Sequence, residues 1–95
     1  MRTRYIVCYD VADPGRLRKV HLLLRGYGEW MQFSIFSCEL NERERVTLGA
    51  GVEQLINAVE DQVLFIDVGP VEGRAGTAIE SLGRPLEPRK RVLVI

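Results

Sequence analysis

One carboxylate, that of Asp10, is the best candidate in this sequence for catalysis or metal binding. Asp10 follows the apolar, β-branched run of residues 5–9 and directly precedes a loop. A strand end fixes a side chain, while the loop leaves it open to ligands. Carboxylate oxygens suit Mg²⁺ or another divalent cation such as Mn²⁺, which proteins often hold with one or two carboxylates, waters and phosphate oxygens. Asp10 is therefore the candidate catalytic and metal-binding residue; the alternative is that Asp10 only shapes the turn.

Basic side chains form the second candidate feature. The formal net charge is zero, yet residues 1–25 carry six basic and two acidic residues, and residues 39–61 carry six acidic and two basic ones. A polyanion responds to the local field more than to the total charge. The predicted nucleic-acid contacts are Arg16, Arg18, Lys19 and Arg25, with Ser34 as an additional phosphate contact. The alternative for the basic set is a solvated helix face.

Other chemistries have little support. His21 is the only histidine and lies within a helical pattern, so a hydrolase with a Ser-His-Asp or Cys-His set is not expected. Cys8 and Cys38 lie among apolar neighbours and match neither a zinc knuckle nor a disulfide framework, so both are expected to be buried. The cysteines predict a reduced, cytoplasmic setting. No apolar run reaches the roughly 18 residues that a membrane span needs.

Hydrophobic periodicity and helix-capping residues predict the helices and strands that carry these residues. Asp13-Pro14 predicts the start of a helix, and Asn41 with Glu44 predicts a capping box, although Gly49 and Gly51 leave the start of that second helix open. The predicted strands are 5–11, two short strands within 30–40 joined by a bend near 33–37, 62–68, a short edge strand at 77–82, and a strand-like tail at 91–95.

This order predicts an α+β fold of the ferredoxin-like type, β-α-β-β-α-β with an extra C-terminal strand. Ninety-five residues allow one domain, here 1–95, with a core at about 4–70 and a C-terminal dimer-pairing segment at about 77–95. A multidomain enzyme is excluded.

The first strand is apolar on both faces. Ile6 and Cys8 alternate with Val7 and Tyr9, yet two helices cover only one face of such a sheet. We therefore expect a homodimer through the sheet face, with the C-terminal strand pairing at an edge of its partner. Two copies of Asp10 near the two-fold axis would share one metal ion. The alternative is a tail that folds back over its own sheet.

Several motifs occur together in one order. They are Tyr5-Ile6-Val7-Cys8-Tyr9-Asp10-Val11, then Arg16 to Lys19-Val20, then Tyr27-Gly28, then Gln32-Phe33-Ser34-Ile35-Phe36. In this order they resemble the CRISPR-associated protein two family, the small partner of the integrase in spacer acquisition. Ser37 stands where that family usually has Glu, and Leu17 where it has the second Arg of a pair.

The resemblance implies a ferredoxin-like homodimer with Asp10 of each subunit at the metal. It implies a metal-dependent endonuclease acting on single-stranded RNA or double-stranded DNA. It also implies an antiviral-defence role in a complex with the CRISPR integrase. The alternative function is a non-catalytic dimer that bridges integrase subunits on protospacer DNA. A small metabolite-binding regulatory dimer is a third interpretation, because this fold hosts many functions.

Overall fold

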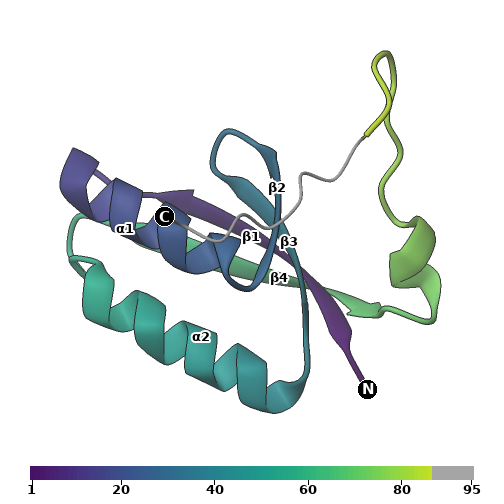
Figure 1. The fold of residues 1–95 in the computed structure, drawn as a ribbon, viewed down its shortest axis with the longest axis horizontal. Coiled ribbons are helices and arrows are strands. Elements are labelled where there is room, and N and C mark those ends of the chain that lie inside the picture. The colour runs from purple at the N-terminus through teal and green to yellow at the C-terminus, as the bar shows by residue number, and fades with distance from the viewer. Residues whose placement is uncertain (87–95) are drawn as a thin grey trace.

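The structure is a computed structural model, and it describes residues 1–86. Its elements follow the predicted α+β order and end with a short 3₁₀ helix, η1 (Figure 1). In chain order they are β1 (Thr3–Asp10), α1 (Pro14–Arg25), β2 (Gly28–Gln32), β3 (Ile35–Leu40), α2 (Glu42–Leu55), β4 (Gln62–Pro70) and η1 (Arg74–Thr77). None of the described helices is long and apolar enough to cross a membrane.

The strands form one antiparallel sheet in the order β2-β3-β1-β4, which is the ferredoxin-like topology. β1 lies between β3 and β4, so its backbone is hydrogen-bonded on both sides. β2 and β3 are joined by the two-residue turn Phe33-Ser34, which confirms the predicted pair of short strands and places the bend at the start of the expected interval. β1 and β3 are thus the two central strands of the sheet.

Both helix starts use the side chains that the sequence indicated. The Asp13 carboxylate accepts a hydrogen bond from the backbone N–H of Arg16 at 2.9 Å, with Pro14 in the first turn. The Asn41 and Glu44 side chains each accept from the other's backbone N–H, at 2.8 and 2.9 Å, and complete the capping box. α2 therefore begins at Glu42, and its two glycines do not delay the start.

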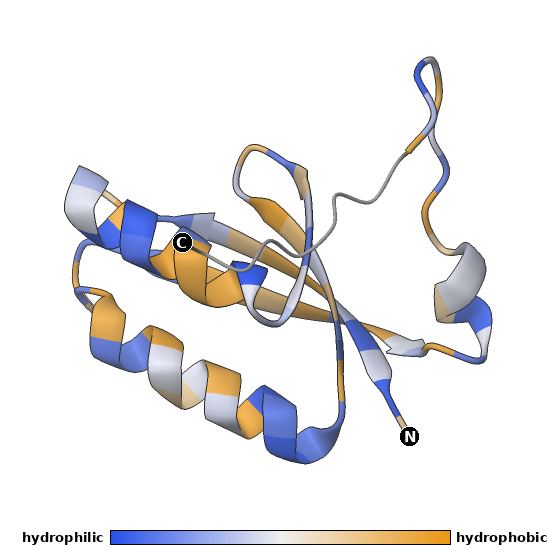
Figure 2. Ribbon diagram, viewed as in Figure 1, coloured by the Kyte–Doolittle hydropathy of each residue, from blue (hydrophilic) through white to orange (hydrophobic). Residues whose placement is uncertain are grey.

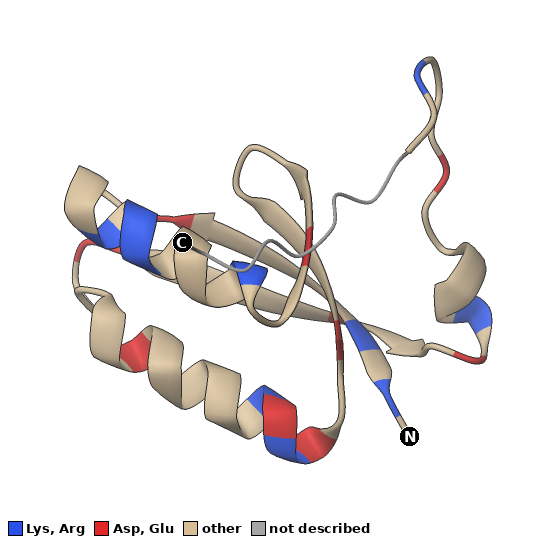
Figure 3. Ribbon diagram, viewed as in Figure 1, with Lys and Arg blue, Asp and Glu red and all other residues tan. Residues whose placement is uncertain are grey.

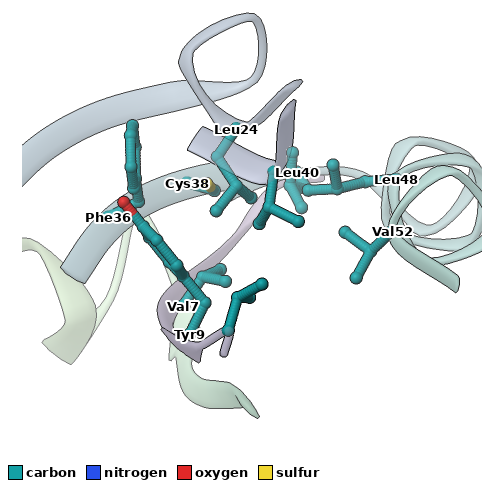
Figure 4. Close-up of a cluster of buried hydrophobic side chains, with 10 residues drawn as sticks. Val7, Tyr9, Leu24, Phe36, Cys38, Leu40, Leu48 and Val52 are labelled. Carbon is teal, nitrogen blue, oxygen red and sulfur yellow. The ribbon is translucent and has the colours of Figure 1, made fainter. Parts of the chain in front are cut away.

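The core lies between the helices and one face of the sheet (Figure 4). Its buried residues are Val7, Tyr9, Val11, Val20, Leu24, Phe36, Cys38, Leu40, Leu48 and Val52. Both helices contribute to this cluster, so both cover the same face (Figure 1). Cys38 is buried as expected. Cys8 is only partly buried, because it lies on the face that no helix covers.

The opposite face of the sheet is apolar and open to solvent. Leu64 and Ile66 of β4 are 46% and 45% exposed, and in the register they pair with Cys8 and Ile6 of β1. Figure 2 shows hydrophobic positions along the strands of the sheet. The sequence expectation of a sheet with two apolar faces, one of them uncovered by helices, is confirmed for the described residues.

The predicted edge strand at 77–82 is wrong. After Pro70 the chain curls through turns in which Gly73 N–H donates to the Pro70 carbonyl and Gly76 N–H to the Gly73 carbonyl, at 3.0 and 3.2 Å. These bonds lead into η1, whose Ala75 is buried, and residues 78–86 join no strand. The alternation of polar and apolar residues at 77–82 is typical of a strand, but a strand forms only where it can pair with a neighbouring strand. The tail at 91–95 lies outside the described residues.

Candidate active site

Asp10 is the last residue of β1 and lies on the sheet face that carries no helix. Its neighbour Tyr9 is buried beneath the helices, and side chains alternate along a strand. The Asp10 side chain is exposed, and within residues 1–86 its carboxylate makes no hydrogen bond or ion pair. The sheet therefore presents a well-positioned carboxylate whose oxygens remain available to a ligand.

Two other chain segments border this strand end. On one side, the Tyr9 N–H donates to the Ser34 carbonyl at 3.1 Å, so the β2–β3 turn lies beside the end of β1. On the other side, Asp10 pairs with Gln62, the first residue of β4. Of the residues predicted from the sequence, Ser34 thus lies one strand away from Asp10. Ser37 lies farther along β3, opposite Ile6.

Arg16, one of the predicted phosphate contacts, is held by two carboxylates of the same chain. Its Nε donates to Asp61 Oδ2 at 2.8 Å, and its Nη2 donates to Glu60 Oε1 at 3.0 Å. The hydrogen bond to Asp61 raises the pKa of Arg16 further above its ordinary value. The guanidinium therefore ties the first turn of α1 to the loop before β4.

The other basic residues of α1 have different surroundings. Arg18 and Lys19 are exposed on the helix, and Figure 3 shows basic positions along α1. The Arg25 guanidinium lies over the Trp30 ring, 5.8 Å from its centroid. Arg25 is the last residue of α1, a helix about 18 Å long, and its contact with Trp30 places it against β2. The structure places Arg18 and Lys19 within the first two turns.

Asp61 is a residue whose role the sequence did not reveal. Its side chain is 0% exposed, and it accepts hydrogen bonds from the backbone N–H groups of Ala12 and Asn57 at 2.9 and 2.8 Å. Bonds from Arg16 fill its remaining acceptor positions. Chiefly through Arg16, these donors hold the pKa of Asp61 well below its usual range, against the opposing effect of burial. The only sequence signal was an acidic residue immediately before a strand.

Through Ala12, Asp61 fixes the loop that follows Asp10. That loop contains buried Val11, and it ends at the cap residue Asp13. The contact joins residues 49 positions apart in the chain. Asp61 therefore sets the course of the chain after β1. Both oxygens of its own carboxylate are already occupied by hydrogen bonds.

An aromatic cluster supports the same strand end from the helix side. The Tyr9 hydroxyl and His21 Nδ1 are 2.7 Å apart, and the His21 ring packs edge-on against Trp30 and Phe36. Burial raises the pKa of Tyr9, and burial together with Arg25 lowers the pKa of His21. His21 is thus a packed, neutral partner of Tyr9, in agreement with the structural role expected of it.

A family model described as CRISPR associated protein Cas2 matches residues 1–72, which include β1, the Asp10 loop and all four strands. The chain belongs to the Cas2 family. A Cas2 relative from Rhodospirillum rubrum, named "CRISPR-associated endoribonuclease Cas2 1", is 42% identical over 91 residues, covering 96% of this chain and 88% of the relative. One from Geobacter sulfurreducens, "CRISPR-associated endoribonuclease Cas2", is 34% identical, covering 100% and 99%.

The solved structures agree on the fold. The crystal structure of Streptococcus pyogenes Cas2 at pH 6.5 superposes with a TM-score of 0.72 at 30% identity, covering 84% of this chain and 99% of that one. The ferredoxin-like sheet with its helices on one face is therefore the Cas2 fold. Membership of the Cas2 family implies a role in CRISPR adaptation.

Proposed function

We propose that this chain is a metal-dependent phosphodiesterase of CRISPR adaptation, acting on RNA or double-stranded DNA, with Asp10 as its metal ligand. The observation that carries the proposal is the exposed Asp10 carboxylate, fixed at the end of a central strand and unpaired within residues 1–86. The nuclease names of the Rhodospirillum and Geobacter relatives support it. The substrate class comes from the family resemblance and is part of the proposal.

The donor chemistry fits a hard divalent cation. A carboxylate oxygen is a ligand for Mg²⁺ or Mn²⁺, which complete their shells with waters and phosphate oxygens. Asp10 of one chain and Asp10 of a second copy would hold the ion. When bound, the metal supplies an activated water and neutralises charge that develops on the phosphate. Asp61 and the aromatic cluster keep the Asp10 strand end in place.

A homodimer is part of the proposal, and the open sheet face supports it. Leu64 and Ile66 expose nearly half of their side chains on the face that also carries Asp10. Large apolar patches rimmed by polar groups mark interaction surfaces. If two such faces meet around a two-fold axis near the end of β1, the same contact buries the apolar residues and brings the two Asp10 carboxylates together.

The basic residues are proposed to position the substrate. Arg18 and Lys19 are exposed on α1 and free to meet phosphates, and Arg25 lies at the other end of that helix. Arg16 has its guanidinium bonded to Asp61 and Glu60, so its first role is to order the loop. Ser34 offers an additional polar contact next to Asp10.

The second candidate function is a DNA-binding dimer that bridges integrase subunits without cleaving. Exposed cations on a rigid helix favour it, because they suit duplex phosphates and need no metal. The two functions differ in what Asp10 does. In the scaffold, Asp10→Asn supports spacer acquisition in cells; in the enzyme, the same change abolishes cleavage.

The test compares cleavage of labelled single-stranded RNA and duplex DNA by wild type, Asp10→Asn and Asp13→Asn, each with Mg²⁺, Mn²⁺ or a chelator. Asp13→Asn is the matched control, because it removes one nearby negative charge and Asn also caps helices well. We expect Asp10→Asn to lose at least about 100-fold of the rate and Asp13→Asn to retain it. Equal, chelator-resistant cleavage by all three proteins would refute the metal role of Asp10.

A further inference from the structure

An aromatic side chain projects into solvent beside the candidate metal ligand. Phe33 is 88% exposed and occupies the two-residue turn between β2 and β3. Its φ is +34°, in the left-handed region that bulky residues rarely adopt. Glycine or asparagine would suit the backbone, and a polar residue would suit the exposure. Neither the core nor the turn accounts for phenylalanine here.

The turn that carries Phe33 is held firmly from below. The Phe33 carbonyl accepts a hydrogen bond from Trp30 Nε1 at 2.8 Å, and the Tyr9 hydroxyl lies 3.5 Å from the same oxygen. The Ser34 carbonyl accepts from the backbone N–H of Tyr9 at 3.1 Å. An unfavourable backbone conformation persists where the surroundings over-determine it, and such positions cluster at functional sites. The phenyl ring is thus presented on a rigid base.

The register brings the turn that carries Phe33 alongside the end of β1. Cys8 pairs with Ile35, and Tyr9 bonds to Ser34, so the turn lies alongside the last residue of β1. Neighbouring strands are about 4.8 Å apart, a spacing that one nucleotide can bridge. A phosphate bound near Asp10 therefore has its own base, or the adjacent one, within reach of the Phe33 ring.

From this placement we infer that Phe33 is a stacking platform for an unpaired nucleobase next to the phosphodiester at Asp10. Exposed aromatic rings bind single strands by stacking on bases, with little dependence on sequence. A base inside a continuous duplex has no free face for the ring. The inference rests on the proposed function and deepens it: it assigns to Phe33 the contact with an unpaired base of the strand that is bound at Asp10.

The test measures binding without cleavage, in the Asp10→Asn background. The probe is a single-stranded oligonucleotide containing 2-aminopurine, whose fluorescence falls when the base stacks on an aromatic ring. Phe33→Asn removes the ring and keeps the turn, because Asn tolerates a left-handed backbone. Phe33→Trp keeps a stacking ring. Val46→Ala, at an exposed position of α2, is the control for loss of an exposed apolar side chain.

We expect Phe33→Asn to lose the quenching and to bind about tenfold more weakly, whereas Phe33→Trp and Val46→Ala keep both. A fully paired duplex should bind all variants alike. Unchanged quenching in Phe33→Asn overturns the inference, and so does loss of the dimer in that variant, which would make Phe33 an interface residue. If stacking is confirmed and wild type does not cleave, the proposed phosphodiesterase fails and the base platform remains.

Discussion

Two aspartates lie at the same end of the sheet in opposite surroundings. Asp10 ends β1 with an exposed carboxylate that accepts no hydrogen bond within residues 1–86. Asp61 immediately precedes Gln62, the residue opposite Asp10 in the register, and its buried carboxylate accepts bonds from Ala12, Asn57 and Arg16. The two carboxylates are chemically identical, so the difference between them is made entirely by their neighbours.

Asp10 is the carboxylate that could do chemistry, and Asp61 is the one that orders the chain around it. A carboxylate whose lone pairs are filled by donors is fixed in space and has no capacity left for a metal ion or a proton. A carboxylate without protein donors keeps that capacity. Asp61 holds Ala12, two residues after Asp10, so the filled carboxylate orders the loop behind the open one.

The two aspartates should differ most in how much each contributes to stability, which is tested by replacing each carboxylate with an amide. In Asp61→Asn one acceptor oxygen becomes a donor that faces Arg16 or a backbone N–H, so we expect the melting temperature to fall by roughly 10 °C. Asp10→Asn loses no internal bond, and its melting temperature should stay within about 2 °C of wild type.

The control for Asp61→Asn is Glu60→Gln, which breaks the neighbouring pair with Arg16. The Glu60 side chain is 58% exposed, and exposed pairs contribute little to stability, so a change below about 2 °C is expected. Thermal unfolding followed by circular dichroism measures all three variants. Equal losses of melting temperature in Asp61→Asn and Asp10→Asn would show that the hydrogen bonds to Asp61 do not make it more important for stability than Asp10.

The stability of the fold in acid should also depend on Asp61. The pKa of Asp61 is depressed in the folded chain, chiefly by Arg16, so the folded state binds fewer protons there than the unfolded state, whose pKa is near 3.9. The stability due to Asp61 is then fully present above about pH 5 and is lost as the pH falls toward 2. In urea unfolding across this range, Asp61→Asn should lose less stability than wild type does. Parallel profiles would contradict the assignment.

Much of the fold was predictable because its signals are local. Asp13-Pro14 and the Asn41–Glu44 box lie within one helical turn, and each works in the structure as the sequence indicated. The edge strand expected at 77–82 failed because pairing is not local. The alternation of residues 77–82 is typical of a strand. However, the turns after Pro70 lead the chain into η1 instead of alongside another strand.

Of the candidate site, only the part that depends on a single strand could be predicted from the sequence. Asp10 could be selected because an apolar run ends there, and its position needs no partner from elsewhere in the chain. Asp61 could not be selected, because its role depends on Ala12 and Arg16, which folding brings to it from α1 and the preceding loop. For the same reason the ion pair between Arg16 and Asp61 could not be predicted, because the sequence shows Arg16 only as one of several basic residues on a helix.

The smallest expected effect separates two arginines of one helix. Arg16→Lys keeps the charge but replaces the planar guanidinium, so one ammonium must replace bonds to both Asp61 and Glu60. The backbone bonds to Asp61 remain, so we expect the melting temperature to fall by about 3–5 °C, less than in Asp61→Asn. Arg18→Lys is the matched control: Arg18 is exposed on the same turn and should tolerate lysine within about 1 °C. If both variants melt alike, the Arg16 ion pair does not order the loop, and Arg16 returns to the set of phosphate contacts together with Arg18 and Lys19.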